Sequence, residues 1–175
     1  MHPSSIAKSE YSVLRQRGIS VTIQVMNTEQ TFCMIKPGLL QRRQVGEILT
    51  RLERTGLRIV ACKMMRMDTG LCRTHYAHLT ERSFFPALEQ YMTSGPMLAL
   101  VLEGYNAVAA LRTLCGPTES ETAPPGTIRG DYALLTRKNI IHSSDSPETA
   151  QQEIERFFRP EEIFAYEDEH EHWFW

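Results

Sequence analysis

The sequence predicts an α+β domain of the ferredoxin-like, split βαβ class, a four-stranded antiparallel sheet with helices plus extra short helices. Two observations lead to this class. Short apolar runs of strand length alternate with segments whose apolar residues recur at helical spacing. In chain order, the main elements are therefore strand, helix, strand, strand, helix, strand. The 175 residues suit one domain, and no internal repeat or low-complexity linker divides them.

The N-terminal segment is polar, and only residues 19–26 have strand character. We therefore divide the chain into a partly flexible N-terminal extension, residues 1–30, and a domain, residues 31–175. The extension fits an organellar transit segment, an oligomer arm or an expression remnant. Glu10 and the absence of a basic amphipathic helix weigh against the transit segment, so a cytoplasmic protein is expected.

The domain begins with two predicted strands separated by a helix. Residues 31–35 form an apolar run, which predicts a buried strand. Apolar residues at helical spacing predict a helix over residues 45–52, with Gly56 where it would stop. Alternating apolar and basic residues predict the second strand over residues 57–67.

Two short helices follow, one capped by Asp68 or Thr69 and running to His78, the other over residues 84–92. Residues 97–102 are the most continuous apolar run of the chain and predict a central strand.

The C-terminal half is expected to hold the remaining elements. Asn106 caps a predicted helix that runs through Leu114, and residues 116–126 contain three prolines and predict an irregular loop. Residues 132–135 predict the last strand, and residues 147–158 predict a helix.

The composition excludes several function classes. With 19 basic and 21 acidic residues the net charge is −2, so no broad field for nucleic acid or membranes is expected. No apolar run approaches the ~20 residues of a membrane helix. The four cysteines lack CxxC spacing, and we expect buried apolar thiols in a reducing compartment. The sequence also lacks the P-loop, Rossmann, GxSxG and HExxH motifs. His170 and His172, in the acidic tail, are expected to be surface residues rather than metal ligands.

Residues 139–146 (NIIHSSDS) place His142 between an apolar run and a helix start, with Ser146 as the N-cap. Neutral imidazole is a competent nucleophile, and histidine can carry a covalent phosphate. Such a histidine can equally be a loop residue at an element boundary. Residues 126–131 (GTIRGD) favour phosphoryl chemistry, because they form a tight turn that delivers Arg129 nearby.

Three cations, Lys36, Arg112 and Arg129, lie near predicted strand or helix ends. Fixed cations stabilise the charge on a phosphoryl group during its transfer. Each alone could be a solvated surface charge, but all three could meet His142 at one rim of the sheet. Glu153 lies about two turns into the helix that follows His142, where it could orient the imidazole or remain an exposed helix acid.

These stretches closely resemble the active-site signature of the nucleoside diphosphate kinases. The resemblance rests on residues 139–146 and 125–131 (PGTIRGD), and it covers the chain from about Gln30 onward without a gap. Further segments match the family in order and spacing: residues 31–37 (TFCMIKP), 45–48 (VGEI), 75–76 (HY), 82–85 (RSFF), 91–96 (YMTSGP), Asn106 and 116–118 (GPT).

The resemblance implies ping-pong transfer of the terminal phosphate of a nucleoside triphosphate, such as ATP, to a nucleoside diphosphate. Its catalytic residues would be His142, which carries the phosphate, with Glu153, Ser144, Lys36 and Tyr76 around it. Its nucleotide-binding residues would be Lys36, Arg112, Thr118, Arg129 and Asn139 for the phosphates and ribose, and Phe84 for the base.

The resemblance also implies Mg²⁺ held by the nucleotide phosphates, with no metal ligand from the protein. It implies a homo-oligomer, with a hexamer favoured over a tetramer or dimer. No membrane and no specific nucleic acid are expected as partners. A rival function is a nucleotide-binding or protein-interaction module of the same fold with weak catalysis.

Three departures from the family pattern bear on rate and assembly. Gly38-Leu39 replaces the usual Asp-Gly, and Ser143 replaces the usual glycine after the histidine. If position 143 requires a positive φ, a side chain there costs free energy. Residues 117–120 lack the usual Asn-Pro pair, which affects a loop that contributes to hexamer contacts.

Overall fold

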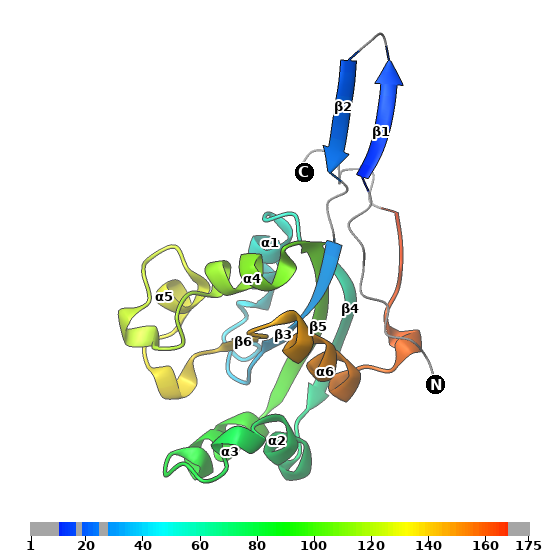
Figure 1. Cartoon of the computed structure of the whole chain (residues 1–175). Helices are drawn as coiled ribbons and strands as arrows, with labels where there is room; N and C mark the ends of the chain where they lie inside the picture. Colours follow the sequence, from blue (N-terminus) through cyan, green and yellow to red (C-terminus); the bar gives the residue numbers. More distant parts are fainter. Residues whose placement is uncertain (1–10, 17–18, 25–27, 168–175) are drawn as a thin grey trace.

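The computed structural model of the chain describes residues 11–16, 19–24 and 28–167. Within the predicted extension, β1 (Tyr11–Gln16) and β2 (Ile19–Gln24) pair antiparallel as a separate two-stranded sheet (Figure 1). The first strand of the domain begins at Thr28, before the predicted boundary. His170 and His172 lie outside the described residues, as does Glu10.

The main sheet has four antiparallel strands in the order β4-β5-β3-β6 (Figure 1). These are β3 (Thr28–Ile35), β4 (Arg58–Arg66), β5 (Pro96–Tyr105) and β6 (Ile141–Ser143). The predicted ferredoxin-like α+β class is confirmed. β5 is central, as its continuous apolar run predicted, because a strand with helices on both faces buries nearly every side chain.

Helices cover both faces of the sheet. α6 (Pro147–Phe157), α2 (Thr69–His75) and α3 (Phe85–Thr93) contribute to a core around Phe32 and Met34. α1 (Val45–Glu53) and α4 (Ala107–Cys115) contribute to a second core around Cys33 and Ile35. The two cores alternate along β3 because successive side chains of a strand point to opposite faces.

The local signals at several helix ends agree with the structure. The Asp68 carboxylate accepts from Leu71 N at the start of α2, and Gly56, after α1, has a positive φ of 81°. Asn106 occupies the N-cap position of α4, but its backbone is left-handed and its side chain makes no cap hydrogen bond.

The prediction of a last strand over residues 132–135 is wrong. Instead, α5 (Ile128–Tyr132) ends at Tyr132, and η3 (Thr136–Lys138) follows. Thr127 Oγ1 caps the start of α5 by accepting from Gly130 N. The apolar run after α5 is largely on the surface, with Leu134 83% exposed. Arg129 therefore lies in a helix rather than in a turn, and the last strand is β6, only three residues long.

The cysteines were expected to be buried, and this holds for three of the four. Cys33, Cys72 and Cys115 are buried free thiols, whereas Cys62 is exposed on the edge strand β4.

Two short 3-10 helices, η1 (Ala77–Leu79) and η2 (Ser120–Thr122), lie in connections, and η4 (Pro160–Glu162) follows α6. Within the described residues, no helix has the length and apolar character needed to cross a membrane.

Candidate active site

The centre of the site is a contact between β6 and α6. The Nε2 atom of His142 lies 2.9 Å from Oε1 and 3.0 Å from Oε2 of Glu153. A carboxylate can only accept, so Nε2 carries the proton and Nδ1 keeps its lone pair. Burial lowers the pKa of His142 below its usual value, although the Glu153 carboxylate acts in the opposite direction. The ring is therefore neutral near pH 7 and has the character of a nucleophile.

Glu153 is fixed by its helix and by a second donor. Ser146 Oγ accepts from Thr149 N, with Pro147 at the first helical position, so α6 starts directly after the strand that bears the histidine. Ser144 Oγ donates to Glu153 Oε2 at 2.6 Å. The carboxylate is 4% exposed, not an exposed helix acid, and both its oxygens have partners.

Lys36 lies at the end of β3, on the same rim. Its Nζ donates to Asn139 Oδ1 at 2.7 Å, and its backbone N donates to Ile140 O at 2.8 Å. Burial, with the nearby Arg129, lowers the pKa of Lys36 to about 7. Tyr76 is buried beside it, with its ring centroid 5.9 Å from Nζ.

The chain between Asn139 and His142 is strained. Ile140 has a φ of 58°, in the left-handed region that β-branched residues rarely adopt. Strain of this kind persists where the surrounding structure overdetermines the backbone, and it clusters at functional sites. Here it accompanies the turn that joins the Lys36 partner, Asn139, to the strand of His142.

Arg129 reaches the rim from α5. Its Nη1 donates to Gly116 O at 2.5 Å and its Nη2 to Ile141 O at 2.9 Å. Burial lowers its pKa. Its Nε is buried and has no hydrogen-bond partner among the described residues, which is uncommon for a buried donor.

The other predicted site residues are exposed. Arg112 lies on α4, close enough to Arg129 to lower its pKa, and Thr118 O accepts from Asn139 Nδ2 at 3.5 Å. Phe84 is 53% exposed just before α3. Among the described residues, no hydrogen bond joins these three side chains to His142.

Ser143 lies on the face opposite His142. Its cross-strand partner is Cys33, whereas that of His142 is Met34, and its hydroxyl hydrogen-bonds the Cys115 thiol. Ser143 is not among the residues with positive φ. The backbone strain anticipated for a side chain at position 143 therefore does not arise. The Ser143 hydroxyl also does not face His142.

The sequence predicted no role for His75, which lies beside His142 and Glu153. Its ring centroid is 4.8 Å from that of His142, and its Nδ1 lies 3.8 Å from Glu153 Oε1. The signals for it in the sequence were its position next to Tyr76, within a predicted short helix, and the match of residues 75–76 to the family.

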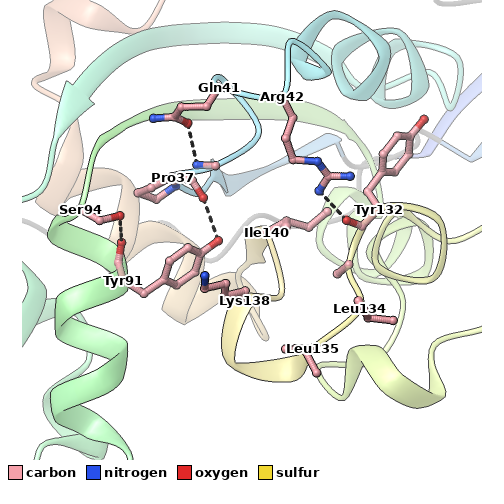
Figure 2. Close-up of a pocket in the computed structure, with 12 residues that line it drawn as sticks. Pro37, Gln41, Arg42, Tyr91, Ser94, Tyr132, Leu134, Leu135, Lys138 and Ile140 are labelled. Carbon is pink, nitrogen blue, oxygen red and sulfur yellow. Dashed lines mark hydrogen bonds between the residues drawn. The ribbon is translucent and has the colours of Figure 1, made fainter.

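A pocket of about 520 Å³ lies next to this rim (Figure 2). Pro37 and Ile140, chain neighbours of Lys36 and Asn139, contribute to its wall. Figure 2 shows Tyr91, whose hydroxyl donates to Pro37 O at 2.9 Å. No predicted site residue lines this pocket, so the candidate chemistry belongs to the rim and not to this cavity.

Among the described residues, one group has the spacing of metal ligands: His75, His142 and Glu153, with donor atoms within 4.8 Å of one another. Two of its three donors are imidazole nitrogens, whereas Mg²⁺ prefers oxygen ligands. Lys36 and Arg129, the buried basic residues of the rim, are not metal ligands. The donor set of His75, His142 and Glu153 therefore does not match the oxygen ligands that Mg²⁺ prefers.

Comparison with known proteins adds the following similarities. A family model described as nucleoside diphosphate kinase matches residues 29–163. A nucleoside diphosphate kinase of Treponema pallidum is 49% identical over 143 residues, which are 82% of this chain and 96% of that protein. A mitochondrial nucleoside diphosphate kinase of Columba livia is 47% identical over 139 residues, 79% of this chain and 77% of that protein.

Solved structures show the same similarity. A halophilic nucleoside diphosphate kinase from Halobacterium salinarum in complex with CDP superposes with a TM-score of 0.83 at 40% identity. The superposition covers 85% of this chain and 99% of that one.

Proposed function

The chain belongs to the nucleoside diphosphate kinase family, and on this premise we propose that His142 carries the phosphate as an Nδ1-linked phosphohistidine. The enzyme transfers the terminal phosphate of a nucleoside triphosphate reversibly to a nucleoside diphosphate. The observation that carries the proposal is the contact of both Glu153 oxygens with His142 Nε2, at 2.9 and 3.0 Å. This contact leaves Nδ1 as the nitrogen with a free lone pair.

The reaction has two half-reactions that mirror each other. In the first, Nδ1 attacks the terminal phosphorus, the bond to the bridging oxygen breaks, and the nucleoside diphosphate leaves with that bonding pair. Nε2 keeps its proton, and Glu153 stabilises the positive charge that the ring acquires. In the second, a terminal oxygen of another nucleoside diphosphate attacks the phosphorus, and the P–N bond breaks to return the neutral ring.

The cations of the rim hold the phosphates. Lys36 and Arg129 are buried, so their charges act in a poorly solvated site and stabilise the transferring group more than they would in water. Arg112 and Thr118 are exposed beside them and bind the remaining phosphates. Tyr76 lies beside Lys36 and the transferred group.

The nucleoside extends from this rim. Asn139 and Lys36 reach the ribose hydroxyls, and Phe84 stacks on the base with its exposed ring. A ring face offers stacking without hydrogen-bond readout, so it suits low selectivity among bases. The CDP complex of the relative from Halobacterium salinarum supports a nucleotide as the ligand.

Mg²⁺ is the divalent ion proposed here, and it enters as part of the nucleotide substrate. It neutralises phosphate charge, while the protein contributes cations and hydrogen-bond donors instead of metal ligands. Magnesium removal with a chelator is expected to stop phosphate transfer while leaving the fold unchanged.

We further propose that the enzyme is a homo-oligomer, with a hexamer favoured over a tetramer or dimer. Residues 31–175 form the catalytic domain and residues 1–30 an extension. A cytoplasmic location is proposed, and the mitochondrial relative from Columba livia keeps an organellar location as the alternative.

The test is a labelling experiment with γ-labelled ATP and Mg²⁺. We expect an acid-labile, alkali-stable phosphoprotein that a nucleoside diphosphate discharges. Phosphorus NMR of the denatured phosphoprotein should assign the phosphate to Nδ1. Absence of label, or label that persists in His142→Ala, contradicts the mechanism.

A further inference from the structure

Glu153 and Arg156 lie three positions apart on α6, the spacing at which a carboxylate and a guanidinium on a helix commonly pair. Within the described part of the chain, no ion pair joins them. Arg156 Nη1 instead lies 3.3 Å from Nδ1 of His75, which is itself 3.8 Å from Glu153 Oε1. The imidazole of His75 therefore stands close to both charged partners.

The tautomer of His75 follows from this contact. A guanidinium can only donate, so Nδ1 of His75 accepts and the proton of the neutral ring is on Nε2. Nε2 has no hydrogen-bond partner among the described residues, although the side chain is 1% exposed. Burial, followed by the nearby His142 and Arg156, lowers the pKa of His75 to about 2, so the ring stays neutral.

Aromatic rings fix the orientation of this imidazole. The ring centroid of Tyr76 lies at 4.5 Å, that of His142 at 4.8 Å and that of Phe157 at 5.1 Å. A buried N–H without a partner is unfavourable and calls for a reason. The reason here is that a proton on Nε2 leaves Nδ1 free to accept a hydrogen bond from Arg156.

From these contacts we propose that His75 is a positioning residue that holds Arg156 away from Glu153, so that the carboxylate serves His142 alone. The inference rests on the proposed function, in which Glu153 stabilises the ring of His142 as it becomes positively charged. A guanidinium paired with Glu153 would compete for the same oxygens, weaken the bond to Nε2 and slow the attack of Nδ1.

The test compares single-turnover phosphorylation rates in a double-mutant cycle. His75→Phe removes the acceptor and frees Arg156, and it should slow phosphorylation roughly tenfold or more. Arg156→Leu should stay within about twofold of wild type, because no guanidinium then competes. Adding Arg156→Leu to His75→Phe should restore the rate to within about threefold of wild type.

A matched pair of polar variants separates the acceptor from the volume of the ring. The amide oxygen of His75→Asn can occupy the position of Nδ1 and accept from Arg156, so this variant should keep most of the rate. The oxygen of His75→Gln reaches farther, near the position of Nε2, so this variant should be slow and should regain activity with Arg156→Leu. If circular dichroism shows that His75→Phe does not fold, the Asn and Gln variants take its place in the double-mutant cycle with Arg156→Leu.

The outcomes are distinguishable. An unlabelled wild-type protein contradicts the proposed function itself. Two outcomes contradict only the role of His75, provided that the wild type is labelled. One is a His75→Phe variant that is phosphorylated as fast as wild type, and the other is a slow variant whose rate Arg156→Leu does not restore. A crystal structure of His75→Phe should show Arg156 paired with Glu153, and a guanidinium that still points away would also overturn the inference.

Discussion

Ser144 and Glu153 are joined by a hydrogen bond of 2.6 Å, from Oγ to Oε2 of the carboxylate that also contacts His142. The serine is 1% exposed and its Oγ also accepts from Phe32 N, on the neighbouring strand. The hydroxyl thus couples the helix of the carboxylate to the centre of the sheet.

Ser144→Ala should slow phosphorylation of His142 by roughly tenfold and lower the free energy of unfolding by about 1–3 kcal/mol, because a buried charged acceptor loses a donor. Single-turnover labelling and urea unfolding measure the two effects. An unchanged rate would show that His142 alone suffices to orient the carboxylate.

Glu153→Gln keeps the shape of the side chain and removes its charge. The amide cannot stabilise a positively charged ring and can present an N–H to Nε2, which favours the wrong tautomer. We expect the rate of phosphate transfer to fall by about 10²–10⁴-fold, measured by the same labelling. A loss of less than about threefold would contradict the proposed role of the carboxylate.

The pH dependence of phosphorylation should follow His142 on its acid side. A protonated Nδ1 cannot attack, and burial lowers the pKa of this ring below the usual 6.5. Activity should therefore persist below pH 6.5 and be lost only as the pH falls through the lowered value. A profile of single-turnover rate against pH tests this, and an acid limb above pH 6.5 would contradict it.

The burial of Lys36 should lower the free energy of unfolding of the protein near neutral pH. Its pKa is lowered from 10.5 to about 7 in the folded state, so between these values the unfolded chain binds more protons. Stability of the wild type should consequently rise as the pH increases from 7 to 10.5. Lys36→Met should lack this rise, be more stable at pH 7 by about 1–4 kcal/mol, and be inactive.

Urea unfolding of both proteins at pH 7 and pH 9 measures this difference, and Lys138→Met, which removes a lysine outside the site, is the matched control. A Lys36→Met variant that is less stable than wild type at both pH values would mean that the bond to Asn139 outweighs the cost of burying the ammonium.

Ser143→Gly should leave the phosphorylation rate within about twofold of wild type, because the side chain lies on the face opposite His142. The variant loses the contact with the Cys115 thiol and gains backbone freedom in the unfolded state, so stability should fall by about 0.5–1.5 kcal/mol. A large change in rate would show that the hydroxyl acts on the nucleophile through the backbone.

Much of the fold could be predicted because its signals are local. The helix over residues 147–158 was correctly predicted, since Ser146 and Pro147 mark its start through contacts within one turn. The central strand over residues 97–102 was predicted from its continuous apolar run. The apolar residues before His142 had strand character, but the last strand was placed over residues 132–135. A strand of three residues carries no periodicity, and the exposed apolar run after α5 resembled a strand more closely.

The sequence by itself determined the class of the fold and the family, and it named the residues that we propose for phosphoryl transfer, because residue identity and spacing along the chain carry this information. Only the tertiary structure decided that Glu153 is buried against His142, that Ser143 faces away, and that His75 stands between Glu153 and Arg156. The physical reason is that burial, tautomer and competition between charges depend on atoms far apart in the sequence. His75 and Glu153, 78 positions apart, meet only when α2 and α6 close on the same face of the sheet.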